Sequence, residues 1–103
     1  MNYWSSVGIP FTISKEDVLK NVCRVFELTE KELRSRRRFR NVVDAKTALC
    51  YVLHRKNKYT STSVGLFINL DHATILHHCR KAEQLIETDK EFLEKIKQLN
   101  IKL

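Results

Sequence analysis

The sequence predicts an all-α domain, a compact bundle of about five to six helices, and two observations support this. The composition is 43% apolar and 30% charged, with two glycines and one proline in 103 residues, which suits packed helices better than a turn-rich sheet. Apolar residues also recur at three- and four-residue steps behind helix-capping residues. A chain of this length supports one modest core. We therefore expect one domain over residues 13–103, with residues 1–12 as an N-terminal extension.

Capping residues mark the first two helices. Ser14, with Asp17 three positions later, opens an amphipathic helix at about residues 15–27. Thr29 and Glu32 repeat this pattern before a short helical turn that ends near Leu33. The apolar residues of the longer helix have helical spacing: Val18, Leu19, Val22, Cys23, Val25 and Phe26.

A central core helix is predicted after an arginine-rich loop. The run RSRRRFR, residues 34–40, has no apolar period and is expected to form the loop. Asn41 is of the right type to cap the next helix, which extends to about Lys56. Its inward face is predicted to consist of Val42, Val43, Ala45, Ala48, Leu49, Val52 and Leu53.

The remaining sequence predicts three further helices. A short helix over residues 62–68 ends at a tight break, Asn69-Leu70, and Asp71 is of the right type to cap a longer helix. Thr88 with Glu91 marks the start of the terminal helix. The buried stripe of the longer helix is expected to be Ile75, Cys79, Ala82 and Ile86, and that of the terminal helix Phe92, Leu93, Ile96 and Leu99.

Positive charge is concentrated in one part of the chain. The net charge is +7, yet residues 34–58 carry nine basic residues and one acid, so the rest of the chain sums to −1. Localised positive charge beside well-patterned helices indicates a polyanionic partner. We therefore expect nucleic acid to be the partner.

Three of the four histidines lie in DHATILHHCRK, residues 71–81, and raise the question of a metal site. Two helical histidines that share a metal sit at i and i+4, whereas His77 and His78 are adjacent and point about 100° apart. We therefore expect no metal site and place both at the helix surface. The three cysteines form no CxxC pair and are expected to be small buried residues. No catalytic set, cofactor site or small-molecule site is predicted, so the chain is not expected to be an enzyme.

A short helix, a tight break and a longer helix form the layout of a helix-turn-helix, whose second helix enters the major groove by its N-terminal end. The first turn of that helix contains Asp71, His72, Ala73 and Thr74. Asp accepts from a cytosine amino group, His donates or accepts at a base edge, and Ala contacts a thymine methyl group. Each residue also has an ordinary structural role, as cap, border residue or helix former.

Residues 69–83 resemble a known family, the C-terminal DNA-binding domain of the bacterial replication initiator DnaA. The family's stretch reads approximately G-R-D-H-T-T-V-L-H-A-C-R-K-I-E, and residues 69–83 read N-L-D-H-A-T-I-L-H-H-C-R-K-A-E. The resemblance extends to ISKEDVLKNVCRVFELTEKELRSRRR as the opening helix and basic loop, and to VVDAKTALCYVLHRK as the central helix. It covers about residues 13–99.

The resemblance implies a set of DNA contacts. Arg40 in the basic loop corresponds to the family's minor-groove arginine, and Asp71, His72 and Ala73 correspond to its base-reading residues in the major groove. Leu70 and Ala73 stand where the family has arginine and threonine, so we expect a different or more relaxed target site. The implied phosphate contacts are Arg37, Arg38, Lys46, Ser61, Thr62, Thr74 and Lys81.

The expected function is double-stranded DNA binding by a free-standing domain without the initiator's ATPase module. We expect a cytoplasmic, nucleoid-associated protein encoded by a bacterium or a phage, with no membrane partner. Two alternatives remain open at this stage: a protein-interaction module that kept the fold but lost base reading, and a metal-binding protein that uses the histidines. A monomer and a dimer on two half-sites are both compatible with the sequence.

Overall fold

A computed structural model of the chain describes residues 14–35 and 39–99. The expected N-terminal extension, residues 1–12, and two predicted phosphate contacts, Arg37 and Arg38, lie outside the described residues. The described residues are helical with short connections and contain no strand, which confirms the all-α prediction.

The first two helices begin where their caps predict. Helix α1 (Lys15–Phe26) follows Ser14, whose side chain accepts from the backbone N–H of Asp17. Helix α2 (Glu30–Arg34) follows Thr29, which forms both halves of a capping box with Glu32, at 3.1 and 2.9 Å. Local hydrogen bonds of this kind satisfy backbone donors that have no partner inside the helix.

The central helix starts earlier than predicted and changes its winding. Helix α3 (Arg40–Cys50) begins after Phe39, and no side chain caps it, so the prediction of Asn41 as the cap is wrong. Phe39 is extended, and Asn41 already lies within the helix. The helix continues as a π-helical stretch, η1 (Tyr51–Lys56), to the predicted end. The predicted inward face is buried except for Val43, which is half-buried.

The last three helices follow the predicted order with two corrections. Helix α4 (Ser61–Ile68) is capped by the Thr60 side chain and starts one residue early, and α5 (His72–Thr88) is capped by Asp71 as predicted. Helix α6 (Lys90–Gln98) is capped by Asp89, not by Thr88. The Thr88 hydroxyl instead donates back to the Gln84 carbonyl inside α5, at 2.8 Å.

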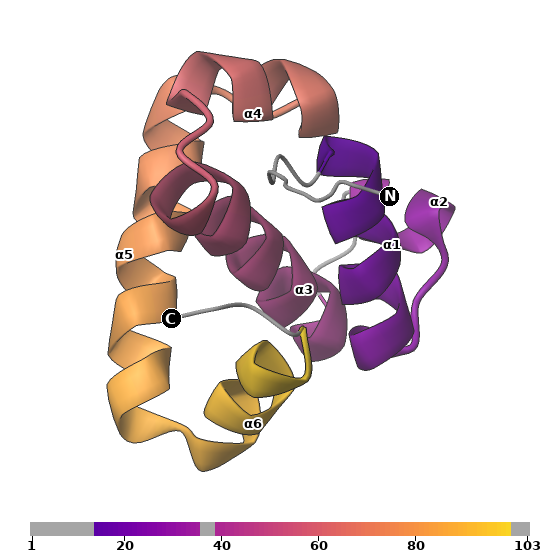
Figure 1. Ribbon diagram of the computed structural model, residues 1–103, viewed down its shortest axis with the longest axis vertical. Helices are drawn as coiled ribbons and strands as arrows, with labels where there is room; N and C mark the ends of the chain where they lie inside the picture. Colours follow the sequence, from indigo (N-terminus) through magenta and orange to yellow (C-terminus); the bar gives the residue numbers. More distant parts are fainter. Residues whose placement is uncertain (1–13, 36–38, 100–103) are drawn as a thin grey trace, which may run out of the picture.

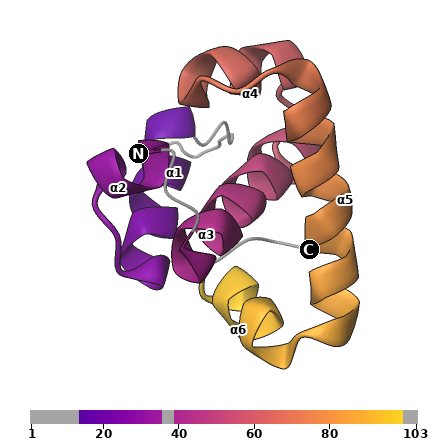
Figure 2. The ribbon, with the colours of Figure 1, turned by 180° about the vertical axis from the view of Figure 1, so that it is seen from behind.

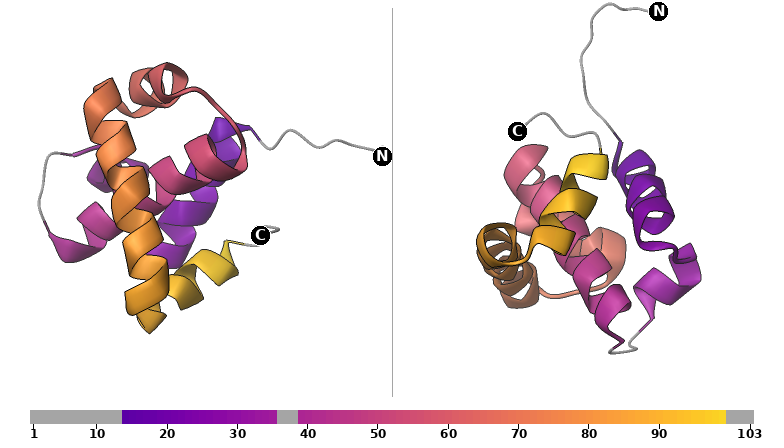
Figure 3. Two further views of the ribbon diagram at one scale, coloured as in Figure 1. Left: turned by 90° about the vertical axis from the view of Figure 1, so that its left-hand side faces the viewer. Right: turned by 90° about the horizontal axis from the view of Figure 1, so that it is seen from below.

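Helix α3 lies at the centre of the bundle, between α1 and α5 (Figures 1 and 2). Helix α4 crosses one end of the bundle, and α5 runs from there along α3 to the other end, where α6 begins. From below, α6 lies between α5 and α1, which it contacts (Figure 3). The core residues from all six helices form one cluster, so the turn between α4 and α5 rests on a packed scaffold.

Candidate nucleic-acid interface

The turn between α4 and α5 is held by its own backbone. Helix α4 ends at Asn69, which adopts the left-handed conformation with φ 60°, a role in which Asn is tolerated. The N–H of Leu70 then donates to the carbonyl of Gly65 at 2.9 Å. A Cβ at position 65 would lie 2.4 Å from the Leu70 carbonyl oxygen. Only glycine therefore allows the turn to lie this close to α4.

Asp71 starts α5 and remains exposed. Its Oδ1 accepts from the backbone N–H of Thr74 at 2.7 Å. Hydrogen bonds from the Thr74 side chain and backbone hold the pKa of Asp71 below its ordinary value. The carboxylate is therefore ionised near neutral pH, as both a cap and an acceptor for base amino groups require.

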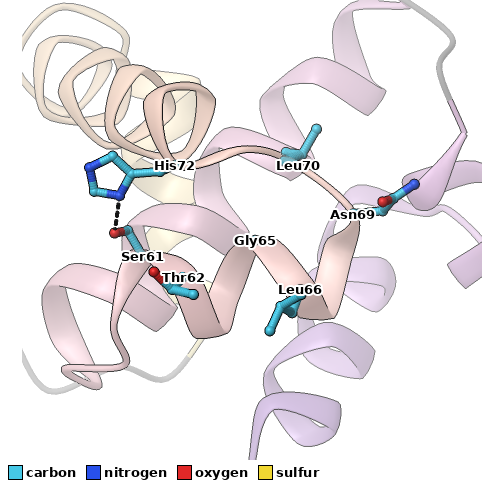
Figure 4. Close-up of a pocket in the computed structure, with 7 residues that line it drawn as sticks. All are labelled: Ser61, Thr62, Gly65, Leu66, Asn69, Leu70 and His72. Atoms are coloured by element: carbon cyan, nitrogen blue, oxygen red, sulfur yellow. Dashed lines mark hydrogen bonds between the residues drawn. The ribbon is translucent and has the colours of Figure 1, made fainter.

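His72, the first residue of α5, is exposed but tethered to α4. Its Nδ1 lies 2.5 Å from the hydroxyl oxygen of Ser61, the first residue of α4 (Figure 4). Ser61 is buried, with 8% of its surface exposed, whereas Thr62 and Ala73 are exposed. The hydroxyl of Ser61, predicted from the resemblance to contact phosphate, is thus engaged with a base-reading candidate.

Two leucines flank this turn. Leu66 is 83% exposed, whereas Leu70 is half-buried and packs against the core. A shallow pocket of about 240 Å³ lies between the two helices. It is lined by Ser61, Thr62, Gly65, Leu66, Asn69, Leu70 and His72 (Figure 4).

Along the rest of α5, the predicted stripe separates core from surface. Ile75, Cys79 and Ala82 are fully buried, and Ile86 is half-buried. The opposite face is exposed: Ala73, His77, Arg80, Lys81 and Gln84. Thr74 is half-buried at the border.

The expectation that His78 is a surface residue is wrong. His78 is half-buried, and its Nδ1 lies 3.0 Å from the hydroxyl oxygen of Thr47. Because that hydroxyl donates to the Val43 carbonyl, the imidazole Nδ1–H is the donor to Thr47. Burial, followed by the neighbouring His77 and Lys46, lowers the pKa of His78. His78 therefore joins α5 to α3 as a neutral ring.

The predicted cations have contrasting surroundings. Arg40 has a 77% exposed side chain and lies 3.5 Å from Asp44 and 3.1 Å from Asp89. The second ion pair locates Arg40 beside the C-terminal end of α5, at the other end of that helix from His72. Lys46 is half-buried and donates to the Ser35 carbonyl, whereas Lys81 is exposed.

Three of the four histidines have hydrogen-bond partners within the protein, and the cysteines are buried. His54, His72 and His78 use a ring nitrogen for three separate protein partners. In residues 14–35 and 39–99 no three potential ligands come together for a metal ion. All three cysteines are buried, as predicted, and burial is the main cause that raises the pKa of each thiol. A buried thiol of raised pKa is a poor nucleophile.

Two contacts in this region were missed by sequence reasoning. Ser61 and His72 are 11 residues apart, and Arg40 and Asp89 are 49 apart. The only local signal was the position of Ser61 and His72 at the starts of consecutive helices. Nothing in the sequence marks Asp89 as a partner of Arg40.

A short helix, a tight turn and a longer helix with an exposed, capped first turn define a helix-turn-helix domain. The family described as bacterial dnaA protein helix-turn-helix matches residues 15–82, and the chain belongs to this family. The resemblance of the DHATILHHCRK stretch is thereby confirmed at the level of the family. Among the described helices, none has the length and apolar character that crossing a membrane requires.

Several relatives are chromosomal replication initiator proteins DnaA. The chain is 32% identical to the DnaA protein of Bacteroides thetaiotaomicron, in an alignment that covers 84% of the present chain. It is 34% identical to the DnaA protein of Flavobacterium psychrophilum, with 88% of the present chain covered. It is 26% identical to that of Campylobacter jejuni over 88% of its length. The chain spans about a fifth of these relatives, 19% to 21% of their length.

Proposed function

We propose that this chain binds double-stranded DNA, with the first turn of α5 in the major groove. The observation that carries the proposal is the exposed, capped start of α5 in a domain of the DnaA helix-turn-helix family. The relatives are named for chromosomal replication initiation. For this chain we propose DNA binding in a bacterial or phage context, without ATP hydrolysis.

Base reading is assigned to Asp71, His72 and Ala73, with Leu70 beside them. Asp71 is exposed, and its carboxylate suits a base amino group. Ala73 is exposed and suits a thymine methyl group. The Leu70 side chain packs against the core and cannot donate a hydrogen bond to a base. An arginine at this position, paired with guanine, would contribute about 1–3 kcal/mol of discrimination between bases. This supports a target site different from, or more relaxed than, that of the family.

Arg40 is assigned to the adjacent minor groove, and its position constrains how the domain docks. A 17-residue helix is about 25 Å long, so Arg40, near the end of α5, is about that far from His72. An α5 that entered the groove end-on would leave Arg40 far from the duplex. We therefore propose that α5 lies inclined along the DNA, so that both its start and the Arg40 region face the same duplex.

Phosphate contacts are assigned to residues around this face. Thr62 and Lys81 are exposed and suited to direct contact. The Ser61 hydroxyl is engaged with His72, so we assign the phosphate contact of Ser61 to its backbone N–H at the start of α4. Helix N-termini favour anions. The remaining assigned contacts are Arg37, Arg38, Lys46 and Thr74, and Lys46 has to exchange its bond to the Ser35 carbonyl for one to phosphate.

The proposal is tested by titrating a random duplex pool at several salt concentrations, followed by selection and sequencing. The assigned cations are Arg37, Arg38, Arg40, Lys46 and Lys81, and they predict a slope of roughly −5 in a plot of log affinity against log salt. Sequencing of the bound fraction identifies the bases that are read. No binding at low salt, or an affinity indifferent to salt, would disprove the proposed function.

The exposure of Leu66 favours one second candidate, a protein-interaction module. Leu66 and the adjoining pocket form an apolar feature on the outer side of α4, and exposed apolar patches mark interaction sites. Leu66→Ser distinguishes the two functions. DNA affinity that is unchanged, together with loss of a protein complex isolated with the wild-type chain, would favour the second candidate.

A further inference from the structure

We infer that Ser61 is a positioning residue that fixes His72 as a hydrogen-bond donor toward a base edge. The inference rests on the proposed function, because the donor has meaning only if the start of α5 meets DNA. It adds a chemical preference, and a residue that controls it, to that site.

The two side chains are arranged so that one ring nitrogen is engaged and the other is presented. Ser61 opens α4 and His72 opens α5, and the Ser61 oxygen lies 2.5 Å from His72 Nδ1. Figure 4 shows the second ring nitrogen, Nε2, pointing away from Ser61. Ser61 is almost completely buried while His72 is exposed. The buried hydroxyl therefore orients an exposed ring.

The hydrogen-bonding capacity of the pair decides the tautomer. Within residues 14–35 and 39–99, the Ser61 hydroxyl bonds to His72 and to no other side chain. If Nδ1 carried the proton, the Ser61 hydroxyl proton would have no protein acceptor among these residues, which is unfavourable for a largely buried residue. If the hydroxyl donates to Nδ1, both groups are satisfied. The neutral ring then carries its proton on Nε2.

An outward Nε2–H selects for acceptors in the major groove. Guanine N7 and O6, adenine N7 and thymine O4 are acceptors, whereas the amino groups of adenine and cytosine are donors. Asp71, the preceding residue, has the opposite preference, because a carboxylate accepts from amino groups. The start of α5 is thus suited to an amino group and an acceptor side by side on the floor of the groove.

The tautomer is tested first on the free protein. Nitrogen chemical shifts of the His72 ring, measured by NMR near pH 8, are expected to report a protonated Nε2 and an unprotonated Nδ1. In Ser61→Ala, the two tautomers are expected to become mixed, while Ser61→Thr, which keeps the hydroxyl, retains the wild-type pattern. A protonated Nδ1 in the wild-type chain would overturn the inference.

The consequence for reading is tested with duplexes selected by the wild-type chain. Ser61→Ala is expected to lose roughly two- to tenfold discrimination at one base position, with the salt slope and thermal stability retained. In a His72→Ala background the same change is expected to have no effect. When purine N7 is the acceptor, replacing the contacted purine by its 7-deaza analogue should weaken DNA binding by the wild-type chain and leave binding by Ser61→Ala almost unchanged. When the contacted base is thymine, replacing it by 4-thiothymine should have the same two effects.

Thr62→Ala is the matched control, because it removes the neighbouring exposed hydroxyl. It is expected to weaken binding to all duplexes equally. Unchanged discrimination in Ser61→Ala, or an effect that persists in His72→Ala, would overturn the positioning role. If the wild-type chain binds no duplex at low salt, the proposed function and the reading role of His72 both fail, whereas the ring shifts still decide the tautomer.

Discussion

The two ends of α5 meet their surroundings in different ways. At its start, the turn is held by a backbone hydrogen bond, a side-chain cap and the bond between Ser61 and His72. At its end, Arg40 is held by two carboxylates at the surface. The first arrangement is built into the backbone and a buried hydroxyl. The second consists of ion pairs between an exposed arginine and two half-buried carboxylates.

This difference teaches how such a domain divides its tasks. Hydrogen bonds to base edges need donors and acceptors in fixed positions, which a preorganised turn provides. Surface ion pairs are worth about 0–1 kcal/mol, so an arginine held by them exchanges its protein partners for contacts with DNA at little cost. Rigid geometry therefore suits reading, and exchangeable charge suits anchoring. The following changes act on one end or the other.

Gly65→Ala is expected to have the largest effect, because it acts on the backbone of the turn. Replacing glycine by alanine within a helix normally raises the free energy of unfolding by roughly 0.5–1 kcal/mol. Overpacking lowers it by roughly 1–3 kcal/mol, and here the added Cβ would overlap the Leu70 carbonyl oxygen. We expect a net loss of about 1–2 kcal/mol, or several degrees in Tm, with weaker DNA binding. Thermal unfolding measures this, with Gln84→Ala on the exposed face of α5 as control. A higher Tm for Gly65→Ala would contradict the close approach.

Asp71→Ala is expected to come next, because it removes the cap of α5 and one reading group together. The folded pKa of Asp71 lies below its ordinary value of 3.8. Its contribution to stability is therefore present above about pH 4 and is lost as the pH falls through the lowered folded pKa. Asp71→Asn keeps an acceptor for the cap and should not show this acid-dependent loss. Unfolding curves of the wild-type chain and Asp71→Asn between about pH 2 and 6 measure this. Equal losses of stability in the two chains would refute the role of the Asp71 carboxylate.

Arg40→Ala tests the other end of α5. It is expected to reduce affinity by roughly three- to tenfold and to reduce the salt slope by about 1, with a larger loss on AT-rich flanks. Lys97→Ala is the control, because it removes the same charge from an exposed position on α6. Equal losses in the two variants, measured by titration with one duplex, would argue against the minor-groove role.

Asp44→Asn is expected to have the smallest effect, in the opposite direction. Removing this carboxylate releases Arg40 from one partner and removes a negative charge near DNA, so affinity should rise about two- to threefold. Glu94→Gln makes the same change in charge at an exposed position on α6 and is the control. A fall in affinity for Asp44→Asn would indicate that Asp44 orients Arg40 for binding.

Local patterns predicted most helix starts, and the failures have a common cause. Ser14, Thr29 and Asp71 were predicted as caps from their residue types and positions, and each side chain accepts from the backbone N–H three residues later. Asn41 and Thr88 are also residues of good capping types, but the N-cap positions are Phe39, two residues before Asn41, and Asp89, one residue after Thr88. Where two neighbouring residues can both start a helix, packing against the rest of the bundle decides the register.

The sequence named residues for the candidate site but gave no sign of their contacts within the protein. Asp71, His72 and Ala73 were named from the first turn of the helix, and all three are exposed there. His78 was misplaced because helical periodicity set it beyond the buried stripe, whereas Thr47 on α3 accepts a hydrogen bond from its ring N–H. A partner on another helix leaves no periodic signal.

The sequence by itself determined the helical class, the buried stripe of α5 and the polar start of that helix, because these depend on spacing within a few residues. The tertiary structure decided the pairing of Ser61 with His72 and of Arg40 with Asp89. These contacts depend on how separate helices are arranged around the core. Which groups are fixed and which can exchange partners therefore becomes visible only in the folded chain.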